Sequence, residues 1–267
     1  MRKDVMRKVA WGQGTLLPFT LLLLPSEAAA PALPQVHPKA RGQYSSLLMW
    51  HDVVPRKKEV WFDTTVAELE EQFAHIKRRG LTPVTLERLA DHLEKGAPIP
   101  KGAVVLTFDD NTMGLYRHLF PLLKRYRWPA VIFVHTDYVG KPTGKEHCTW
   151  DQLREMERSG LVRCHPHTAS HPADMRDLSE KQLQRELAVP IRVMEQQLGG
   201  QRRFFAYSNG FYNERVARSV AKAGYRLAIT EDWGAAQRSP NLMMLRRYSM
   251  HRRAKQAVED TYRAIRR

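Results

Sequence analysis

The fold of this chain is constrained most by a regular alternation of short apolar runs with longer amphipathic segments. The apolar runs, each a candidate strand, are SSLLMW at 45–50, AVVLTF at 103–108, AVIFVH at 130–135, LVRCH at 161–165, FFAYS at 204–208 and RLAIT at 226–230. The segments between them repeat apolar residues at helical spacing. Strands that alternate with helices predict an α/β fold with a parallel sheet covered by helices, either an open doubly wound sheet or a barrel.

Some of the predicted helices carry recognisable end or breaking signals. The first long one has Thr64 or Thr65 as its N-cap and Gly80 at its C-terminal end. Pro190 lies inside the long polar helix predicted at 178–199. Because proline removes a backbone hydrogen bond from a helix interior, we expect Pro190 to bend or break this helix.

The two ends of the chain differ from the part between them. Residues 1–30 start with basic residues, continue with an apolar stretch and end in small residues, which predicts a secretory signal peptide rather than a membrane anchor. Residues 31–46 are rich in Pro and Ala and predict a linker. We expect a single folded domain at 47–250, followed by a basic, solvated helix at 251–267. The protein is therefore expected to be exported to the periplasm, the cell envelope or the medium.

The sequence contains two cysteines, Cys148 and Cys164. Export would make a disulfide between them chemically permissible. Sequence alone cannot show that they meet, so a disulfide and a pair of buried thiols both stay open.

The chain is strongly basic, with 43 Lys and Arg against 28 Asp and Glu and a formal net charge of +15. Such a balance first suggests nucleic acid as a partner. The sequence has no helix-turn-helix, zinc-finger or RNA-binding signature, and an exported protein has little access to nucleic acid. We therefore interpret the charge as attraction to an anionic envelope or membrane surface, or as a contribution to solubility, and expect no nucleic-acid partner.

Polar residues of catalytic type stand at the carboxyl ends of three predicted strands, the edge where parallel α/β folds place their chemistry. Asp109 and Asp110 end one apolar run, His51 follows another, and His167 and His171 follow a third. The two histidines are four residues apart, so on a helical turn both imidazoles could bind one ion. A catalytic metal site needs a third ligand, which either aspartate could supply.

These motifs and their order resemble the polysaccharide deacetylase family, also called the NodB-homology domain or carbohydrate esterase family 4. The matching stretches are TFDD, HTASH and FAYSNGFYN, with LLMWHDV, TWDQLREMERSGLV and AGYRLAIT around them. The surrounding stretches are most similar to the biofilm branch, which deacetylates poly-β-1,6-N-acetylglucosamine. The resemblance implies an irregular (β/α) barrel and an exported, metal-dependent hydrolase that removes N-acetyl groups from such a polysaccharide.

The resemblance also implies a role for each of the polar residues at the strand ends. Asp110, His167 and His171 would hold one divalent metal ion, usually zinc, and Asp109 would be the catalytic base. His51, in the stretch MWHDV, would be the general acid. The chemistry agrees with these roles, because a metal lowers the pKa of a bound water to about 7, a carboxylate can take its proton, and an imidazole can protonate the leaving amine.

Three positions depart from the family pattern. Asn111 stands where the family has Gly, Pro166 restricts His165 before the metal-binding turn, and Ser208 replaces the Pro of the usual PYG. Asn is the best non-Gly residue for a positive φ, and the N–H of Asn209 would still support an oxyanion, with looser placement. The departures motivate an alternative, a weak or inactive relative that binds envelope polysaccharide without hydrolysing it.

Other residues have open assignments. Trp233 would bind substrate by stacking on a sugar face or would pack in the core, and Asp232 is a candidate for tuning an active-site group. His165 is an extra candidate ligand or a wall of the site. Nothing in the sequence favours a particular oligomeric state. We expect His135 and His147 to be structural.

Overall fold

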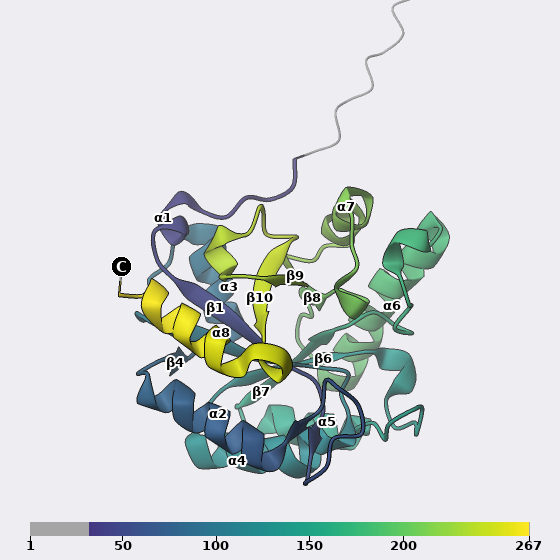
Figure 1. Ribbon diagram of the computed structural model, residues 1–267. Helices are drawn as coiled ribbons and strands as arrows, with labels where there is room; N and C mark the ends of the chain where they lie inside the picture. Colours follow the sequence, from purple (N-terminus) through teal and green to yellow (C-terminus); the bar gives the residue numbers. More distant parts are fainter. Residues whose placement is uncertain (1–31, 267) are drawn as a thin grey trace, which may run out of the picture. The chain divides into compact units, whose positions relative to one another are not determined.

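The apolar runs of the sequence form one parallel sheet that curves into a nearly closed barrel (Figure 1). Seven of its eight strands follow the order β7 (Val162–Pro166), β6 (Ala130–Val134), β5 (Ala103–Asp109), β1 (Ser45–Trp50), β10 (Leu245–Ser249), β9 (Leu227–Trp233) and β8 (Phe204–Ala206). The eighth, β4 (Thr82–Pro83), pairs with β5, whereas β2 (Val53–Val54) and β3 (Thr64–Thr65) form a separate pair. This computed structural model describes residues 32–266, so the predicted signal peptide lies outside the described residues. The predicted irregular (β/α) barrel is confirmed.

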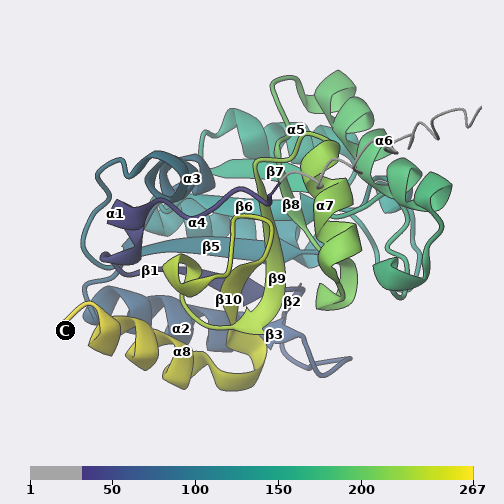
Figure 2. The ribbon, with the colours of Figure 1, turned by 90° about the horizontal axis from the view of Figure 1, so that it is seen from above.

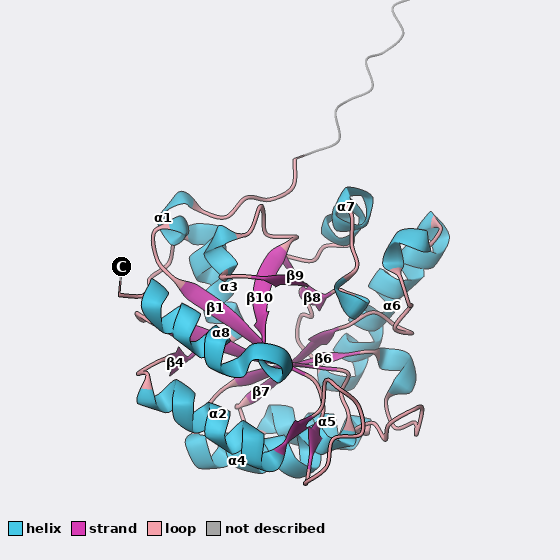
Figure 3. Ribbon diagram, viewed as in Figure 1, coloured by secondary structure: helices cyan, strands magenta, loops and turns pink. Residues whose placement is uncertain are grey.

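Helices lie around the sheet (Figure 2) and alternate with the strands along the chain (Figure 3). The α-helices are α1 (Pro38–Arg41), α2 (Val66–Arg78), α3 (Leu86–Lys95), α4 (Phe120–Tyr126), α5 (Trp150–Arg158), α6 (Glu180–Leu198), α7 (Glu214–Lys222) and α8 (Met250–Ala264). Shorter helical turns are η1 (Leu115–Leu119), η2 (Thr136–Tyr138), η3 (Met175–Asp177), η4 (Ser208–Gly210) and η5 (Ala236–Arg238). We expected Pro190 to bend or break this helix, but α6 continues through it without a break. Within residues 32–266, no helix has the length and apolar character needed to cross a membrane.

Local sequence explains where the helices begin. Thr65 Oγ1 accepts a hydrogen bond from the Glu68 N–H at 3.2 Å, and the Glu68 carboxylate accepts one from the Thr65 N–H at 2.8 Å. The same reciprocal pair, Thr149 with Gln152, begins α5. These contacts satisfy backbone groups that the start of a helix leaves unpaired, and they settle the first predicted cap on Thr65.

Part of the expected linker at 31–46 is folded instead. α1 lies within it, β1 already begins at Ser45, and Val36 and Ala40 are buried in the core. The composition of the segment concealed these two apolar side chains, which are four residues apart and reach the same packed region. The domain boundary therefore lies earlier than residue 47.

The basic tail expected at 251–267 is a helix with one buried face. In α8, Ala257 and Val258 pack against the barrel, and Thr261 Oγ1 donates a hydrogen bond to Ser46 Oγ at 3.1 Å. The exposed side chains of the helix include Arg252, Arg253, Lys255 and Arg263. The helix was expected to be solvated, and its basic residues are exposed, but they mask a short apolar stripe that packs against the barrel.

Alternation along the strands divides their side chains between two packed regions. Leu106 and Phe108 belong to the cluster that includes side chains of α2, α4 and α8, on the outer face of the sheet. Leu47, Val105 and Phe133 belong to the other cluster, on the inner face, together with side chains of β8 and β9. The inner face leads directly to the polar residues at the carboxyl ends of the strands.

Both cysteines are buried and free, so among the described residues no disulfide joins Cys148 to Cys164. Burial raises the pKa of the Cys148 thiol to about 12. Of the two alternatives left open by the sequence, the structure has the pair of buried thiols, in a protonated and unreactive form.

Candidate active site

Strand alternation brings polar side chains together at the carboxyl end of the barrel. Asp109 is the last inward residue of β5, and Arg247 faces inward from β10. His51, His135 and His167 take the next inward positions beyond β1, β6 and β7. The predicted base and acid and one predicted metal ligand therefore come from adjacent parts of the same edge.

Asp109 forms a buried ion pair with Arg247, which binds both carboxylate oxygens. Nη1 and Nη2 of Arg247 donate to Oδ1 and Oδ2 of Asp109 at 3.0 and 2.6 Å, and Nε donates to the Thr230 carbonyl at 2.8 Å. Burial by itself would raise the pKa of Asp109, but the charge and hydrogen bonds of Arg247 hold it below its usual value. Asp109 is therefore ionised at neutral pH and fixed in orientation.

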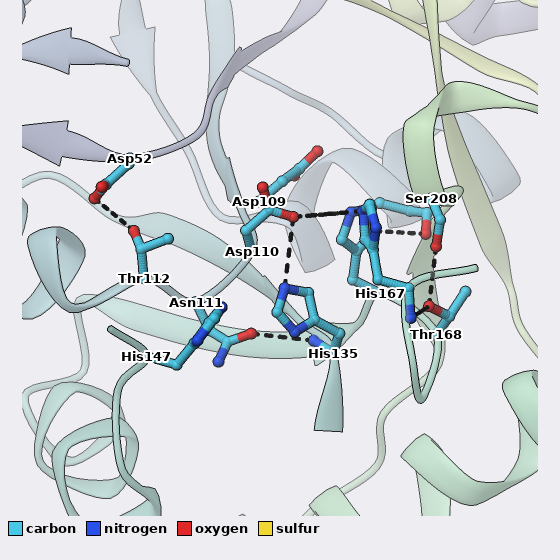
Figure 4. A network of polar contacts seen from close by, with 12 residues as sticks. Asp52, Asp109, Asp110, Asn111, Thr112, His135, His147, His167, Thr168 and Ser208 are labelled. Carbon is cyan, nitrogen blue, oxygen red and sulfur yellow. Dashed lines mark hydrogen bonds and ion pairs between the residues drawn. The ribbon is translucent and has the colours of Figure 1, made fainter. Parts of the chain in front are cut away.

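After Asp109 the chain turns through two residues with left-handed backbone, Asp110 at φ 77° and Asn111 at φ 40°. The Asp110 N–H donates to the Phe133 carbonyl at 3.1 Å, and Asn111 Oδ1 accepts from the His135 N–H at 3.1 Å (Figure 4). Asn111 therefore has the positive φ that its place in the family pattern suggested, and its buried amide links this turn to β6. The turn gives Asp110 a different set of neighbours from Asp109.

Three imidazoles surround one oxygen of Asp110. The Nε2 atoms of His167 and His135 lie 3.5 and 3.7 Å from Asp110 Oδ1 (Figure 4). His171 Nε2 lies 3.6 Å from the same oxygen. Asp110, His167 and His171 offer ligand atoms that all lie within 4.8 Å of one another. In the described part of the chain, Asp110 Oδ1 is nevertheless buried without a hydrogen-bond partner. A divalent cation held by these three residues would satisfy it, so the predicted ligand set fits a metal.

The proton on His167 is placed by the backbone. Nδ1 of His167 lies 2.9 Å from the Ala206 carbonyl, which can only accept, so Nδ1 donates and Nε2 faces Asp110. When the His167 ring is neutral, the lone pair of Nε2 therefore faces the Asp110 carboxylate. Two electron-rich groups so close together are stabilised by a positive charge between them. Burial by itself would lower the pKa of His167, but Asp110 and Asp109 raise it above its usual value. The two carboxylates therefore favour positive charge at this position.

His171 and His135 are neutral imidazoles. Burial, with the nearby charge of His167, lowers the pKa of His171 to about 4. Burial also lowers the pKa of His135 to about 3. A neutral imidazole is the form that binds a metal, so His171 needs no deprotonation to act as a ligand.

The two ligand histidines do not lie on the helical turn that we expected. β7 ends at Pro166, and the following loop contains two residues with left-handed backbone, Thr168 at φ 69° and His171 at φ 52°. Thr168 Oγ1 accepts a hydrogen bond from the His171 N–H at 3.0 Å. This side-chain contact closes a tight turn and brings His171 back beside His167, which a four-residue spacing can do without a helix.

Two side chains from other elements hold this loop. Glu186 of α6 accepts hydrogen bonds from the N–H groups of Ala169 and Ser170 at 2.9 and 2.8 Å. Thr168 Oγ1 and Ser208 Oγ lie 2.9 Å apart (Figure 4). Ser208, the residue at the family's Pro position, thus links η4 to the ligand loop.

A cleft of about 430 Å³ contains the ligand cluster. Asp110, His167 and His171 line it together with His51 and Asn209. The structure therefore places the predicted acid and the predicted oxyanion residue beside the predicted ligands.

The imidazole of His51 is held by ring contacts rather than by hydrogen bonds. Its centroid lies 5.1 Å from that of Phe62 and 5.2 Å from that of His251. Its Nδ1 is buried and has no hydrogen-bond partner within residues 32–266. Among the described residues, no acceptor on that nitrogen therefore fixes the tautomer of the His51 ring.

Three other candidates lie outside this constellation. Trp233 is not among the residues that line this cleft; it is partly buried against the core and lies edge-on to Tyr248 at 4.9 Å, which favours the core alternative. Asp232 accepts a hydrogen bond from a tyrosine hydroxyl at 2.6 Å rather than contacting the site. His165 Nε2 lies 3.5 Å from Glu87 and is not part of the ligand cluster.

Sequence reasoning missed two residues that contact the predicted aspartates. His135, which we expected to be structural, lies beside Asp110, and Arg247 binds Asp109 across 138 positions of sequence. The polar run RRYS hid β10 as a strand, and with it Arg247. Both residues take inward positions at a strand end, which is the signal that could have found them.

A family model of polysaccharide deacetylase matches residues 96–228, about half of the chain. The poly-beta-1,6-N-acetyl-D-glucosamine N-deacetylase of Escherichia coli K12 is 34% identical over 134 residues. This match covers 45% of the present chain but 20% of the E. coli protein, so the chain spans about a fifth of that relative.

Two solved structures share the architecture. IcaB from Ammonifex degensii has a TM-score of 0.74 at 25% identity, covering 82% of this chain and 97% of IcaB. The Streptococcus pyogenes deacetylase PplD, in complex with acetate, also has a TM-score of 0.74, at 23% identity, covering 82% of this chain and 98% of PplD. The structural likeness supports the barrel, and with the match to the family model it leads to one conclusion: the chain belongs to the polysaccharide deacetylase family.

Proposed function

We propose that this chain is a metal-dependent hydrolase that removes N-acetyl groups from a polymer of N-acetylglucosamine, with β-1,6 linkages as its preferred substrate. Family membership and the name of the E. coli relative support the reaction and the sugar. The single observation that carries the proposal is the buried Asp110 Oδ1, surrounded by imidazoles and without a donor among the described residues.

Asp110, His167 and His171 would hold the divalent metal. Their nitrogen and oxygen donors suit zinc, which catalytic sites bind with three protein ligands. When bound, such an ion polarises the acetyl carbonyl and lowers the pKa of a water molecule to about 7. Glu186 and Ser208 hold the ligand loop in place before the ion arrives.

Asp109 would take the proton of the attacking water. Arg247 lowers its pKa, so the carboxylate is a weak base but is ionised across the neutral range. The bidentate contact also fixes both oxygens, which removes the entropy cost of orienting them during the reaction. Each oxygen retains a lone pair for the incoming proton.

His51 would protonate the departing nitrogen, since an amine leaves as the neutral molecule only after it receives a proton. It shares the cleft with the ligand residues. The backbone N–H of Asn209, in the same cleft, would donate to the oxyanion that forms on the acetyl oxygen.

The alternative of an inactive polysaccharide-binding relative rested on Asn111, Pro166 and Ser208. Asn111 adopts the left-handed backbone of a Gly position, Pro166 ends β7, and Ser208 gains a contact to Thr168. None of the three displaces Asp110, His167 or His171 from the cluster. The catalytic proposal is therefore the stronger one.

Export and contact with an anionic envelope surface are part of the proposal. The net charge of +15 and the exposed basic face of α8 are consistent with such a surface. Binding to anionic vesicles that weakens as salt is raised would be the expected result.

Acetate release from defined oligomers tests the function. We expect wild-type protein to release acetate from β-1,6-linked N-acetylglucosamine oligomers faster than from chitin-type or peptidoglycan-type oligomers. His167→Ala should release none above background, and the exposed-site variant Asp151→Asn should match wild type. Equal release by wild type and His167→Ala would refute the proposal, and sugar binding without acetate release would favour the inactive relative.

A further inference from the structure

Two large apolar side chains are exposed in the described chain, and both line the candidate active-site cleft. Trp61 is 58% exposed and Phe211 is 45% exposed. Trp61 lies in the loop between β2 and β3, whereas Phe211 follows η4. Exposed aromatics that gather at one cleft indicate a binding surface, because isolated ones would be scattered over the molecule.

Neighbouring side chains hold each aromatic ring in place. Trp61 lies 5.3 Å from the Phe62 ring, and the guanidinium of Arg252 lies 4.1 Å from its ring centroid. Arg176 lies 4.8 Å from the Phe211 ring. Rings that are ordered before a ligand arrives lose little entropy on binding.

The two aromatic sites differ in their unpaired charges. Arg176, at the Phe211 ring, is neutralised by an ion pair with Asp174. Arg252 lines the cleft beside Trp61 and has no ion pair with any described residue. Glu231 also lines the cleft and has no cationic partner within residues 32–266. It packs against the backbone next to Phe211, since a Cβ built on Gly210 would meet the Glu231 side chain at 2.7 Å. A free carboxylate thus accompanies Phe211, and a free guanidinium accompanies Trp61.

We propose that Trp61 and Phe211 are stacking sites for two further sugar units of the polymer whose N-acetyl group reaches Asp110, and that Glu231 makes the Phe211 site selective for a deacetylated unit. The inference rests on the proposed function, because it assumes that the cleft binds an aminosugar polymer. Pyranose rings have apolar C–H faces that pack on aromatic rings. Because the contacts are spread over several sugar units, we expect a single sugar to bind weakly.

Charge explains the selectivity between the two sites. A deacetylated unit carries an ammonium group at neutral pH, whereas an acetylated unit is neutral. The ammonium is attracted to Glu231 and repelled by Arg252. A partly deacetylated chain would therefore bind with its free amines on the Phe211 side and its acetylated units on the Trp61 side, which sets the direction in which deacetylation extends.

Binding measurements on non-hydrolysing protein test this. In a His167→Ala background, calorimetry compares a fully acetylated β-1,6 hexamer with one that carries a single glucosamine. We expect Trp61→Ala and Phe211→Ala each to weaken binding of the hexamer by about tenfold, as loss of a stacked ring does. Glu231→Gln should remove a preference of about threefold for the glucosamine-containing hexamer, the size expected of an exposed charge pair. The control Glu71→Gln removes an exposed carboxylate on α2 and should change neither.

Each part of the inference has an outcome that would overturn it. Unchanged hexamer binding by both aromatic variants would refute the stacking sites. Equal weakening of the two hexamers by Glu231→Gln would refute the charge selectivity. Acetate release by wild type is measured separately. If wild type releases acetate but the aromatic and Glu231 variants bind both hexamers as tightly as their parent, only the inference is refuted. If the aromatic variants weaken hexamer binding but wild type releases no acetate, only the proposed function is refuted.

Discussion

Asp109 and Asp110 are adjacent in sequence but have opposite relations to the rest of the protein. Both oxygens of Asp109 accept hydrogen bonds from Arg247, so this carboxylate is neutralised by the fold itself. Asp110 Oδ1 is buried among three imidazole nitrogens and has no donor in the described chain. Asp109 is thus paired by the fold, whereas Asp110 lies among candidate metal ligands.

The backbone produces this difference. Asp109 ends β5 with its side chain on the inner face, where β10 delivers Arg247. The left-handed turn at Asp110 and Asn111 then directs the next carboxylate toward β6 and the loop after β7. The two carboxylates therefore have different neighbours: Arg247 binds Asp109, and three histidines surround Asp110. If the two carboxylates act independently, substitutions around Asp110 should affect metal binding and activity, and loss of Arg247 should affect stability.

Loss of the Asp110 charge should abolish activity. Asp110→Asn removes the anionic ligand, and we expect deacetylation to fall by at least about 10³-fold, because the cation supplies several kcal/mol of transition-state stabilisation. Acetate release and metal content by mass spectrometry measure this. A variant that keeps both its metal and its rate would mean that Asp110 is not a ligand.

Loss of Arg247 should cost stability instead. Arg247→Met leaves the Asp109 charge buried and unpaired, and we expect the free energy of unfolding to fall by about 3–5 kcal/mol. Urea unfolding measures it, with Arg78→Met as the control for an exposed ion pair, which should change it by less than about 1 kcal/mol. Equal effects of the two substitutions would show that the Asp109 pair contributes no more than a surface pair.

Zinc should stabilise wild-type protein but not the Asp110→Asn variant. Zinc at about 100 times its dissociation constant should raise the stability of wild type by about 2.7 kcal/mol. Asp110→Asn should gain little from zinc, and its metal-free stability should equal or exceed that of wild type, since a buried unpartnered charge has been removed. Thermal unfolding with and without chelator measures both. Marked destabilisation of metal-free Asp110→Asn would contradict the account.

The smallest effect is expected at Ser208. Ser208→Ala removes the contact to Thr168 and should lower stability by about 1 kcal/mol and zinc affinity by about tenfold. Competition with a chelating dye measures the affinity. A loss of stability without any change in zinc affinity would show that Ser208 supports the fold but not the ligand loop.

The apolar runs with helices between them predicted a parallel α/β fold, and the family resemblance chose the barrel over an open doubly wound sheet. The sequence also predicted that Asp110, His167 and His171 would meet, which the structure shows, although the family resemblance rather than the spacing chose Asp110 over Asp109. Their assigned roles stay predictions until activity and metal binding are measured.

The rest could not be predicted because it depends on distant parts of the chain or on backbone conformation. Arg247 lies in a strand whose polar residues hide it, and its partner is 138 positions away. The loop with Thr168 and His171 uses left-handed residues other than Gly, for which local sequence has no strong signal. Trp61 lies between the short strands β2 and β3, and only the folded chain places it in the cleft with Phe211.

The central claim is that this cleft needs a cation at Asp110 in order to hydrolyse an N-acetyl group. Chelator-treated wild-type protein should release no acetate from a β-1,6-linked N-acetylglucosamine oligomer. Titration with zinc should restore release in proportion to bound metal and saturate at about one ion per chain, the number that one three-ligand site holds. Full acetate release by metal-free protein, verified by mass spectrometry, would contradict the claim.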